Sequence, residues 1–341
     1  MEHVAIDLGT RESQICVRAE DGTILAEDRC GTGSLKKYLA RRPPSRVVME
    51  TCAEAFSVAE AAKSLGHQVE VVPATLVRAL GVGSRGLKTD VRDARNLSEV
   101  SCRMSRLPSV HVPGPVSRER KAMCGLRENL VETRTKLVNG VRGWLRSEGL
   151  GTPKVGHPES FPLRVKEHVA RREKELPIWV ARNLQVIMAS NEQIGDADKE
   201  LGRLARTDPI CRRLMTVPGV GPVTAIRFAS AVDEVSRFQQ AHTLESYLGL
   251  TPGEHSSGSQ KRTTGITKAG SPKLRWALIH AAWAAWRHRR TDPMVVWALK
   301  IQERRGKKIA VVALARKMAG ILYAIWRDGS VYDPRHEQRT E

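Results

Sequence analysis

Residues 4–10 read Val-Ala-Ile-Asp-Leu-Gly-Thr, so that a short apolar run ends at the carboxylate of Asp7. A short apolar run bounded by turn residues is typical of a buried strand. Residues 45–50 repeat the arrangement, because Val47-Val48-Met49 leads into Glu50. Buried strands of an α/β sheet present their carboxyl ends at one edge, so we expect Asp7 and Glu50 to converge there.

The first hundred residues predict an α/β domain built around these two strands. A meander of three strands followed by alternating helices and strands is the pattern of the ribonuclease H fold, with helices on both faces of the sheet. The expected strands are 3–8, 13–19, 22–28, 45–50 and 68–72, and the expected helices are 33–41, 53–65, 75–81 and 90–104.

Two more carboxylates, Asp90 and Asp93, open the helix expected over 90–104, and their spacing places them on one helical face. Four clustered carboxylates repel one another unless cations neutralise them, and Mg²⁺ or Mn²⁺ prefers oxygen ligands. The sequence therefore predicts a site for Mg²⁺ (or Mn²⁺) at Asp7, Glu50, Asp90 and Asp93, of the kind that clamps a phosphodiester. The alternative for Asp90 and Asp93 is a purely capping role, since negative charge is favoured at a helix N-terminus.

The charge of the chain is strongly positive and unevenly spread. The net charge is +19 over 341 residues, of which residues 1–110 carry +2 and residues 111–341 carry +17. Residues 261–320 alone hold 15 Lys and Arg against 2 acids. This bias predicts a polyanionic partner for the second part of the chain, the alternative being a merely solvated basic surface.

Several protein classes are disfavoured by the remaining composition. The six cysteines show no CxxC spacing, which argues against a zinc site and favours buried thiols in a reducing compartment. Met1-Glu2-His3 leads straight into a strand, and no run approaches the roughly 18 apolar residues of a membrane span. We expect a cytoplasmic protein without a membrane partner.

The second part of the chain is expected to be helical. After a proline-rich linker, residues 116–148 and 176–206 predict two long helices around a Gly/Pro-rich break at 150–163. They suggest a coiled-coil hairpin, which serves either as a dimerisation arm or as a helical spacer. Helices at 272–289, 293–304 and 308–326 close the chain.

Two segments between these helices favour phosphate binding. Residues 214–226 have the form of a helix-hairpin-helix element, in which Gly219 and Gly221 allow a tight turn and the next helix offers backbone N–H groups. A structural turn is the alternative. Residues 247–275 form a loop rich in hydroxyl and basic side chains, where a serine can act as nucleophile or the loop can simply be flexible. The cationic residues expected to hold phosphate are Lys261, Arg262, Lys268, Lys273 and Arg275.

The helix that follows this loop carries Trp276, Trp283 and Trp286. We expect these residues to pack in the core or between helices, although one of them can stack on a base.

Five motifs occur in the order found in one known family. They are Ile-Asp-Leu-Gly-Thr at 6–10, Met-Glu-Thr at 49–51, Thr-Asp-Val-Arg-Asp-Ala at 89–94, Val-Pro-Gly-Val-Gly at 217–221, and Gly-Leu-Thr-Pro, Ser-Ser-Gly, Gly-Ile-Thr-Lys-Ala-Gly and Leu-Arg between 249 and 275. Over about residues 3–330 the chain resembles the insertion-sequence transposases of the IS110 type, also called DEDD transposases or bridge-RNA-guided recombinases.

The resemblance implies a RuvC-like catalytic domain at 1–107, a coiled-coil or helical linker domain at 116–206, a C-terminal transposase domain at 207–330 and a tail at 331–341. It places the catalytic acids at Asp7, Glu50, Asp90 and Asp93 and the nucleophile at Ser257, which would form a phosphoserine–DNA intermediate. Ser256 and Ser259 have similar chemistry and blur that assignment.

The resemblance also implies partners. They are double-stranded donor and target DNA, a structured guide RNA encoded beside the transposase, and further copies of the chain in a homodimer or homotetramer. The expected setting is the bacterial cytoplasm, in association with the nucleoid.

Three other functions are weighed against this one. A RuvC-like two-metal endonuclease that resolves Holliday junctions needs the carboxylates but not Ser257, because water attacks. A sugar-kinase or actin-like ATPase also opens with Asp-Leu-Gly-Thr, but no second phosphate loop is clear. A non-catalytic nucleic-acid-binding protein leaves the four placed acids unexplained.

Overall fold

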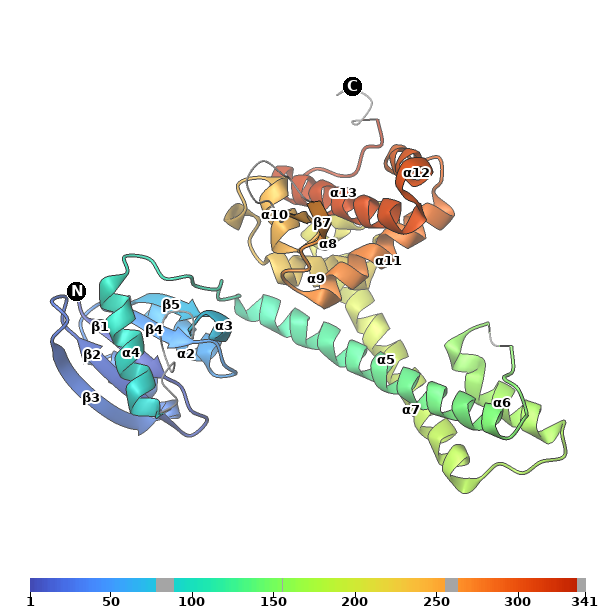
Figure 1. Ribbon diagram of the computed structural model, residues 1–341, viewed down its shortest axis with the longest axis horizontal. Helices are drawn as coiled ribbons and strands as arrows, with labels where there is room; N and C mark the ends of the chain where they lie inside the picture. Colours follow the sequence, from blue (N-terminus) through green and yellow to red (C-terminus); the bar gives the residue numbers. More distant parts are fainter. Residues whose placement is uncertain (78–88, 155, 255–262, 336–341) are drawn as a thin grey trace. The chain divides into compact units, whose positions relative to one another are not determined.

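The computed structural model describes residues 1–77, 89–154, 156–254 and 263–335 (Figure 1). Contacts divide the chain into two compact units, Met1–Pro113 and Gly114–Glu341. The first unit is a mixed α/β domain, and the second is mostly helical. This confirms the coarse fold class that the sequence predicts, an α/β first part followed by a mostly helical remainder.

The first unit is built on a five-stranded sheet in the order β3-β2-β1-β4-β5. The first three strands form an antiparallel meander, whereas β4 pairs parallel with β1 and β5 pairs parallel with β4. All five expected strands are therefore present. They are β1 (His3–Asp7), β2 (Glu12–Arg18), β3 (Ile24–Gly31), β4 (Arg46–Glu50) and β5 (Gln68–Val72).

Helices cover both faces of this sheet. Side chains alternate along β1, so that Val4 and Ile6 pack with α1 (Leu35–Leu39) and α2 (Ala55–Ser64), whereas Ala5 packs with α4 (Asp90–Arg103) on the other face. A one-turn 3₁₀ helix, Thr32–Ser34, precedes α1. The helix expected at 75–81 is described only as α3 (Ala74–Val77), because residues 78–88 lie outside the described residues.

The second unit begins with an antiparallel helical hairpin made of α5 (Pro115–Ser147) and α7 (Ile178–Thr207). Polar pairs along the hairpin fix the register: Arg120 with Asp208 at 2.5 Å, and Arg134 Nη1 with Asn191 at 3.0 Å. Near the far end, α6 (Phe161–Ala170), preceded by a 3₁₀ turn at Pro158–Ser160, closes a small apolar cluster between the two long helices.

The remainder of the second unit packs around a larger apolar core. Six helices and a 3₁₀ turn are described there, together with a two-stranded sheet in which β6 (Pro252–Glu254) pairs antiparallel with β7 (Thr263–Ile266). The helical elements are α8 (Pro209–Leu214), α9 (Pro222–Val232), η3 (Val235–Arg237), α10 (Ala241–Tyr247), α11 (Pro272–His288), α12 (Pro293–Arg305) and α13 (Lys307–Asp328).

Among the described helices, α13 alone is long and apolar enough to pass a membrane-span criterion, with a mean hydropathy of 1.6. The sequence expectation of no such run is therefore too strict. Half of that window is buried inside the protein, and Leu314, Met318 and Leu322 belong to the core of the second unit. A buried core helix passes the same test, so the apolarity of α13 has a packing explanation.

Candidate functional site

Asp7 and Glu50 end two neighbouring parallel strands. The register pairs Ile6 of β1 with Met49 of β4, so the two carboxylates occupy the next positions at the same edge of the sheet. Ala5 and Val48 face α4, and alternation therefore directs Asp7 and Glu50 to that face as well. Both residues are half-buried.

The orientation of α4 brings its first turn to the same edge. Ser101 lies near the end of α4, and its hydroxyl is hydrogen-bonded to His3 Nδ1 at 2.8 Å. The backbone carbonyl of Ser101 accepts a hydrogen bond from Arg46 Nη1, also at 2.8 Å. Because His3 and Arg46 begin β1 and β4, the helix runs antiparallel to both strands. From Ser101 back to Asp93 the helix rises about 12 Å, and from His3 to Asp7 the strand advances about 13 Å. Asp93 therefore lies roughly level with Asp7.

Asp90 and Asp93 continue the buried stripe of α4. Ala94, Leu97 and Ser101 are buried against the sheet. Asp90 lies one helical turn before Ala94, and Asp93 lies one turn before Leu97. Asp93 is half-buried and Asp90 is exposed. Thr89 caps the helix, since its side chain accepts from Arg92 N at 3.4 Å. All four predicted carboxylates thus lie at one edge of one face, although two of them also suit a helix N-terminus.

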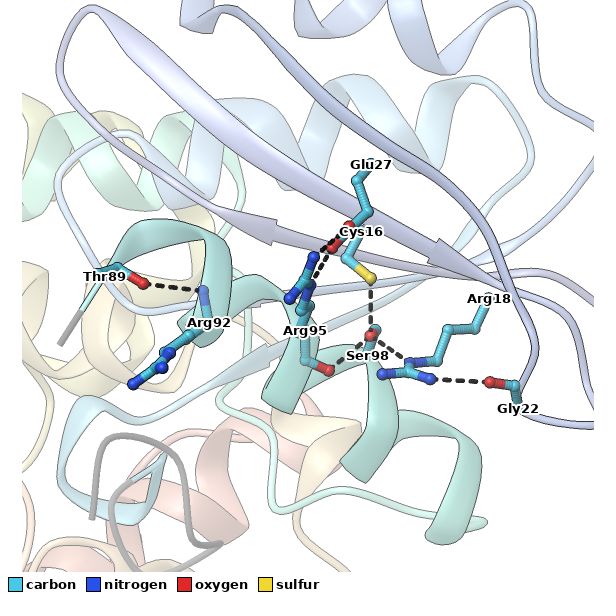
Figure 2. A network of polar contacts seen from close by, with 8 residues as sticks. All are labelled: Cys16, Arg18, Gly22, Glu27, Thr89, Arg92, Arg95 and Ser98. Atoms are coloured by element: carbon cyan, nitrogen blue, oxygen red, sulfur yellow. Dashed lines mark hydrogen bonds and ion pairs between the residues drawn. The ribbon is translucent and has the colours of Figure 1, made fainter. Parts of the chain in front are cut away.

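A polar network fixes α4 on the meander strands (Figure 2). Ser98 Oγ accepts from Arg18 Nε at 2.8 Å, and Arg95 forms a two-pronged ion pair with Glu27 of β3. The hydrogen bond from Arg95 lowers the pKa of Glu27. These contacts set the rotation of α4, and hence the face on which Asp90 and Asp93 stand.

The four side chains fit a divalent cation in chemistry, because all their donors are carboxylate oxygens. Within the described ranges, no group of three or more His, Cys, Asp or Glu side chains is close enough to hold a metal ion. The carboxylates therefore lie at the same edge of the sheet but are not close enough together to coordinate one ion as the structure stands.

The predicted nucleophile, Ser257, lies outside the described residues, as do Lys261 and Arg262. The flanking segments are described. Pro252 pairs with Ile266 and Glu254 with Thr263, so the segment that carries Ser257 joins β6 to β7. Lys268 follows β7 with a φ of 58° and an exposed side chain.

The structure corrects the role predicted for Arg275. Only 8% of this residue is exposed, and its Nη1 donates to the carbonyl oxygens of Leu248, Ala269 and Gly270 at 3.2, 2.6 and 3.1 Å. Arg275 therefore fastens the base of the β6–β7 hairpin instead of offering this nitrogen to a phosphate. Lys273 is half exposed and pairs with Glu128 at 2.9 Å.

The segment predicted as a helix-hairpin-helix element is the turn between α8 and α9, and its two glycines differ. Gly219 has a φ of 85° and approaches Ala281 of α11 so closely that a Cβ would lie 2.1 Å from the carbonyl oxygen. Gly221 has a φ of −96° and open space around it. Only Gly219 is required by the geometry of the turn.

The surface beside this turn includes residues that the sequence does not single out. A cavity of ≈ 430 Å³ is lined by the turn together with Arg289, Asp292 and Tyr332. Tyr332 donates its hydroxyl to Asp292 at 2.7 Å and its N–H to Thr216 Oγ1 at 2.9 Å. The only sequence signal for this region is the basic run Arg287-His288-Arg289-Arg290.

Comparison with known proteins defines the class to which this arrangement belongs. Residues 4–148 match the model of the DEDD transposases of IS110 elements, and residues 211–294 match the model described as Transposase IS116/IS110/IS902 family. The protein is a transposase, an enzyme that cuts and rejoins DNA.

Similar full-length relatives support the same class. The transposase for insertion sequence element IS1111A of Coxiella burnetii is 28% identical over 94% of this chain and 88% of its own length. The transposase for insertion sequence element IS1328 of Yersinia enterocolitica is 28% identical over 96% of this chain and 98% of its own. A probable family 20 transposase of Pseudomonas aeruginosa is 28% identical over 98% and 99%. The chain belongs to the IS110/IS116/IS902 family of insertion-sequence transposases.

Proposed function

We propose that this transposase cuts and rejoins donor and target DNA with an active site made of two parts, one in each unit. The observation that carries the proposal is the convergence of Asp7, Glu50 and the first turn of α4 on one edge of the sheet. The second part is Ser257, on the segment that joins β6 to β7. Its assignment rests on the family motif.

Asp7, Glu50, Asp90 and Asp93 would hold Mg²⁺ or Mn²⁺. When bound, such an ion lowers the pKa of a coordinated hydroxyl and polarises the scissile phosphate. Asp7 and Glu50 would be positioned by the parallel strands β1 and β4, which end side by side. Asp90 and Asp93 would be positioned by the rotation of α4, which the contacts of Arg95 and Ser98 fix.

Ser257 would be the nucleophile. Its Oγ forms a bond to phosphorus while the bond from phosphorus to the 3′ oxygen breaks, which gives a 5′-phosphoserine linkage and a free 3′-OH. The proton lost by the serine balances the proton taken up by the 3′ oxygen. Because the phosphoester bond is conserved, rejoining needs no external energy. The proposal requires Ser257 and the carboxylates to meet, within one chain or between chains of a homodimer or homotetramer.

The second unit would hold nucleic acid. It carries a net charge of +17, and Lys268 and Lys273 present exposed or half-exposed ammonium groups near the β6–β7 hairpin. We assign catalysis to residues 1–107, an arm to 116–206, the serine-bearing transposase domain to 207–330 and a tail to 331–341. A structured RNA encoded with the element would guide the choice of DNA, on bacterial chromosomes.

The experiment that tests this proposal is a denaturing gel of labelled DNA incubated with each variant. Asp7→Asn and Asp90→Asn should abolish cleavage while binding of nucleic acid is kept. Glu99→Gln is the matched control, because Glu99 lies on α4 but pairs with Arg103. Full cleavage by either aspartate variant, or full activity in EDTA, would refute the assignment of the acids.

The same gel separates a recombinase from a two-metal nuclease. Ser257→Ala should lose the covalent protein–DNA adduct and strand exchange, whereas Ser256→Ala and Ser259→Ala should keep part of both. If Ser257→Ala still cuts DNA without forming an adduct, water is the attacking group and the nuclease alternative holds. If the adduct persists, the nucleophile is elsewhere and Ser256 and Ser259 become the candidates. Sequencing the RNA that co-purifies with the wild-type protein tests the guide, and its absence would remove RNA guidance from the proposal.

A further inference from the structure

A large cavity in the second unit lies outside the proposed active site. Its volume is ≈ 780 Å³, and residues of α5, α9 and α11 line it. That volume falls in the range of pockets that bind small organic groups. Much of the lining is apolar, with Val131, Val223 and Ala277 among the contributors.

The cavity contains an exposed aromatic pair. Trp276 of α11 is 56% exposed and stands one helical turn before His280, with the two ring centroids 3.9 Å apart. The other tryptophans of α11 behave differently. Trp286 is buried in the core, and Trp283 is half-buried and packs against Trp286 and under Lys307. A core-packing role thus accounts for Trp283 and Trp286 but not for Trp276.

Cationic side chains line the same cavity as this aromatic pair. Of the two acids that line the cavity, Glu128 is already paired with Arg227 at 3.2 Å and Lys273 at 2.9 Å. Thr135 of α5 also lines a second cavity of ≈ 250 Å³, so the hollow surface continues along α5. Together the two cavities are lined by six cationic side chains against the two carboxylates of Glu128 and Glu132: Arg127, Arg134, Lys136, Arg142, Arg227 and Lys273.

We propose that Trp276 and His280 form a stacking platform for an unpaired nucleobase, with the sugar–phosphate backbone of that strand following the cationic side chains of α5. The inference goes beyond cleavage and rests on the action of this family on DNA. An indole offers a flat, sequence-tolerant surface to a base, and neighbouring cations attract the phosphates.

The occupant is an unpaired base because a base inside a duplex has both faces covered by its neighbours. Bases of single-stranded loops, bulges or opened duplexes have a free face that can stack on an aromatic side chain. Such a base can belong to an opened DNA strand or to a structured RNA. The chemistry of the platform is the same for both.

The test compares Trp276→Ala, Trp276→Phe and a control, Trp179→Ala, in the full-length chain. Trp179 is also exposed, at 47%, but it lies at the start of α7 and contacts Trp144 instead. The probes are labelled oligo(dT), oligo(U), a DNA duplex and a strand of abasic residues, with affinities measured by fluorescence anisotropy. Circular dichroism checks that each variant is folded.

Trp276→Ala should bind oligo(dT) or oligo(U) on the order of 10-fold more weakly, because stacking on an aromatic residue contributes that much per base. Trp276→Phe should bind nearly as well as wild type, and Trp179→Ala should be unchanged. The abasic strand and the duplex should bind equally to wild type and Trp276→Ala. A larger loss on oligo(U) than on oligo(dT) assigns the platform to RNA, and the reverse assigns it to DNA.

Equal affinity of wild type and Trp276→Ala for both single strands would overturn the platform, and so would an equal loss on the abasic strand. A loss of self-association in Trp276→Ala, seen by sedimentation, would also overturn it, because the cavity would then hold a protein surface. None of these outcomes affects the adduct formed by Ser257, so failure of the platform is distinct from failure of the proposed active site.

Discussion

Arg275 shows how one buried side chain can hold a segment of backbone in place. Its Nη1 bonds three carbonyl oxygens at the base of the β6–β7 hairpin. Arg275→Ala leaves these acceptors without their donor, so we expect it to lower the free energy of unfolding by about 2–4 kcal/mol. Urea denaturation of the full chain measures this change.

Lys273→Ala is the matched control for Arg275→Ala, because Lys273 lies on the same helix but is half exposed. Its loss should cost less than about 1 kcal/mol. Equal stability of the two variants would show that the buried guanidinium does not fasten the hairpin.

At the scale of an element, the α8–α9 turn contains two glycines that look alike in the sequence but differ in their surroundings. Gly219→Ala places a Cβ against the backbone of α11 at a positive φ, and we expect a loss of about 2–5 kcal/mol. Gly221→Ala meets open space at an ordinary φ and should cost less than about 1 kcal/mol. The urea midpoints of the two variants test this difference, and similar midpoints would contradict the close approach of the turn to α11.

Elements were predictable where local periodicity determines them. The strands ending at Asp7 and Glu50 and the long helices α5 and α7 follow from apolar patterns within a few turns of chain. Their ends shift by only one or two residues from the expected bounds.

The roles of Arg275 and Trp276 were not predictable in this way. The burial of Arg275 depends on carbonyls as far away as Leu248, and the exposure of Trp276 depends on where α5, more than a hundred residues earlier, meets α11. Periodicity gives the faces of a helix but not which face another element covers. The ends of β1 and β4 at one edge of the sheet were predictable, whereas the rotation of α4 depends on contacts of Arg95, Ser98 and Ser101.

At the scale of the whole molecule, the charge is segregated between the two units. The first unit carries a net +2 and the second +17. Binding of DNA or RNA should therefore weaken steeply with salt, because each Lys or Arg contact releases counterions from phosphate. If six or more phosphates are contacted, affinity should fall roughly 10³-fold or more between about 50 and about 200 mM salt.

Lys268→Gly tests whether Lys268 contributes to this salt dependence. Lys268 is exposed at a positive φ that glycine adopts readily, so the variant removes a charge without straining the backbone. The slope of log affinity against log salt should fall by about one. An unchanged slope would place the phosphate contacts elsewhere, and a flat dependence in the wild type would argue against a phosphate-holding unit.

The length of the α5–α7 hairpin sets a scale for any duplex that lies along it. Helix α5 runs without a break for 33 residues, which corresponds to about 50 Å. About fifteen base pairs of B-DNA have the same length, or one and a half turns of the duplex. A duplex lying along this arm would therefore present opposite faces to its two ends, so the number of base pairs between two contacted segments matters as much as their sequence.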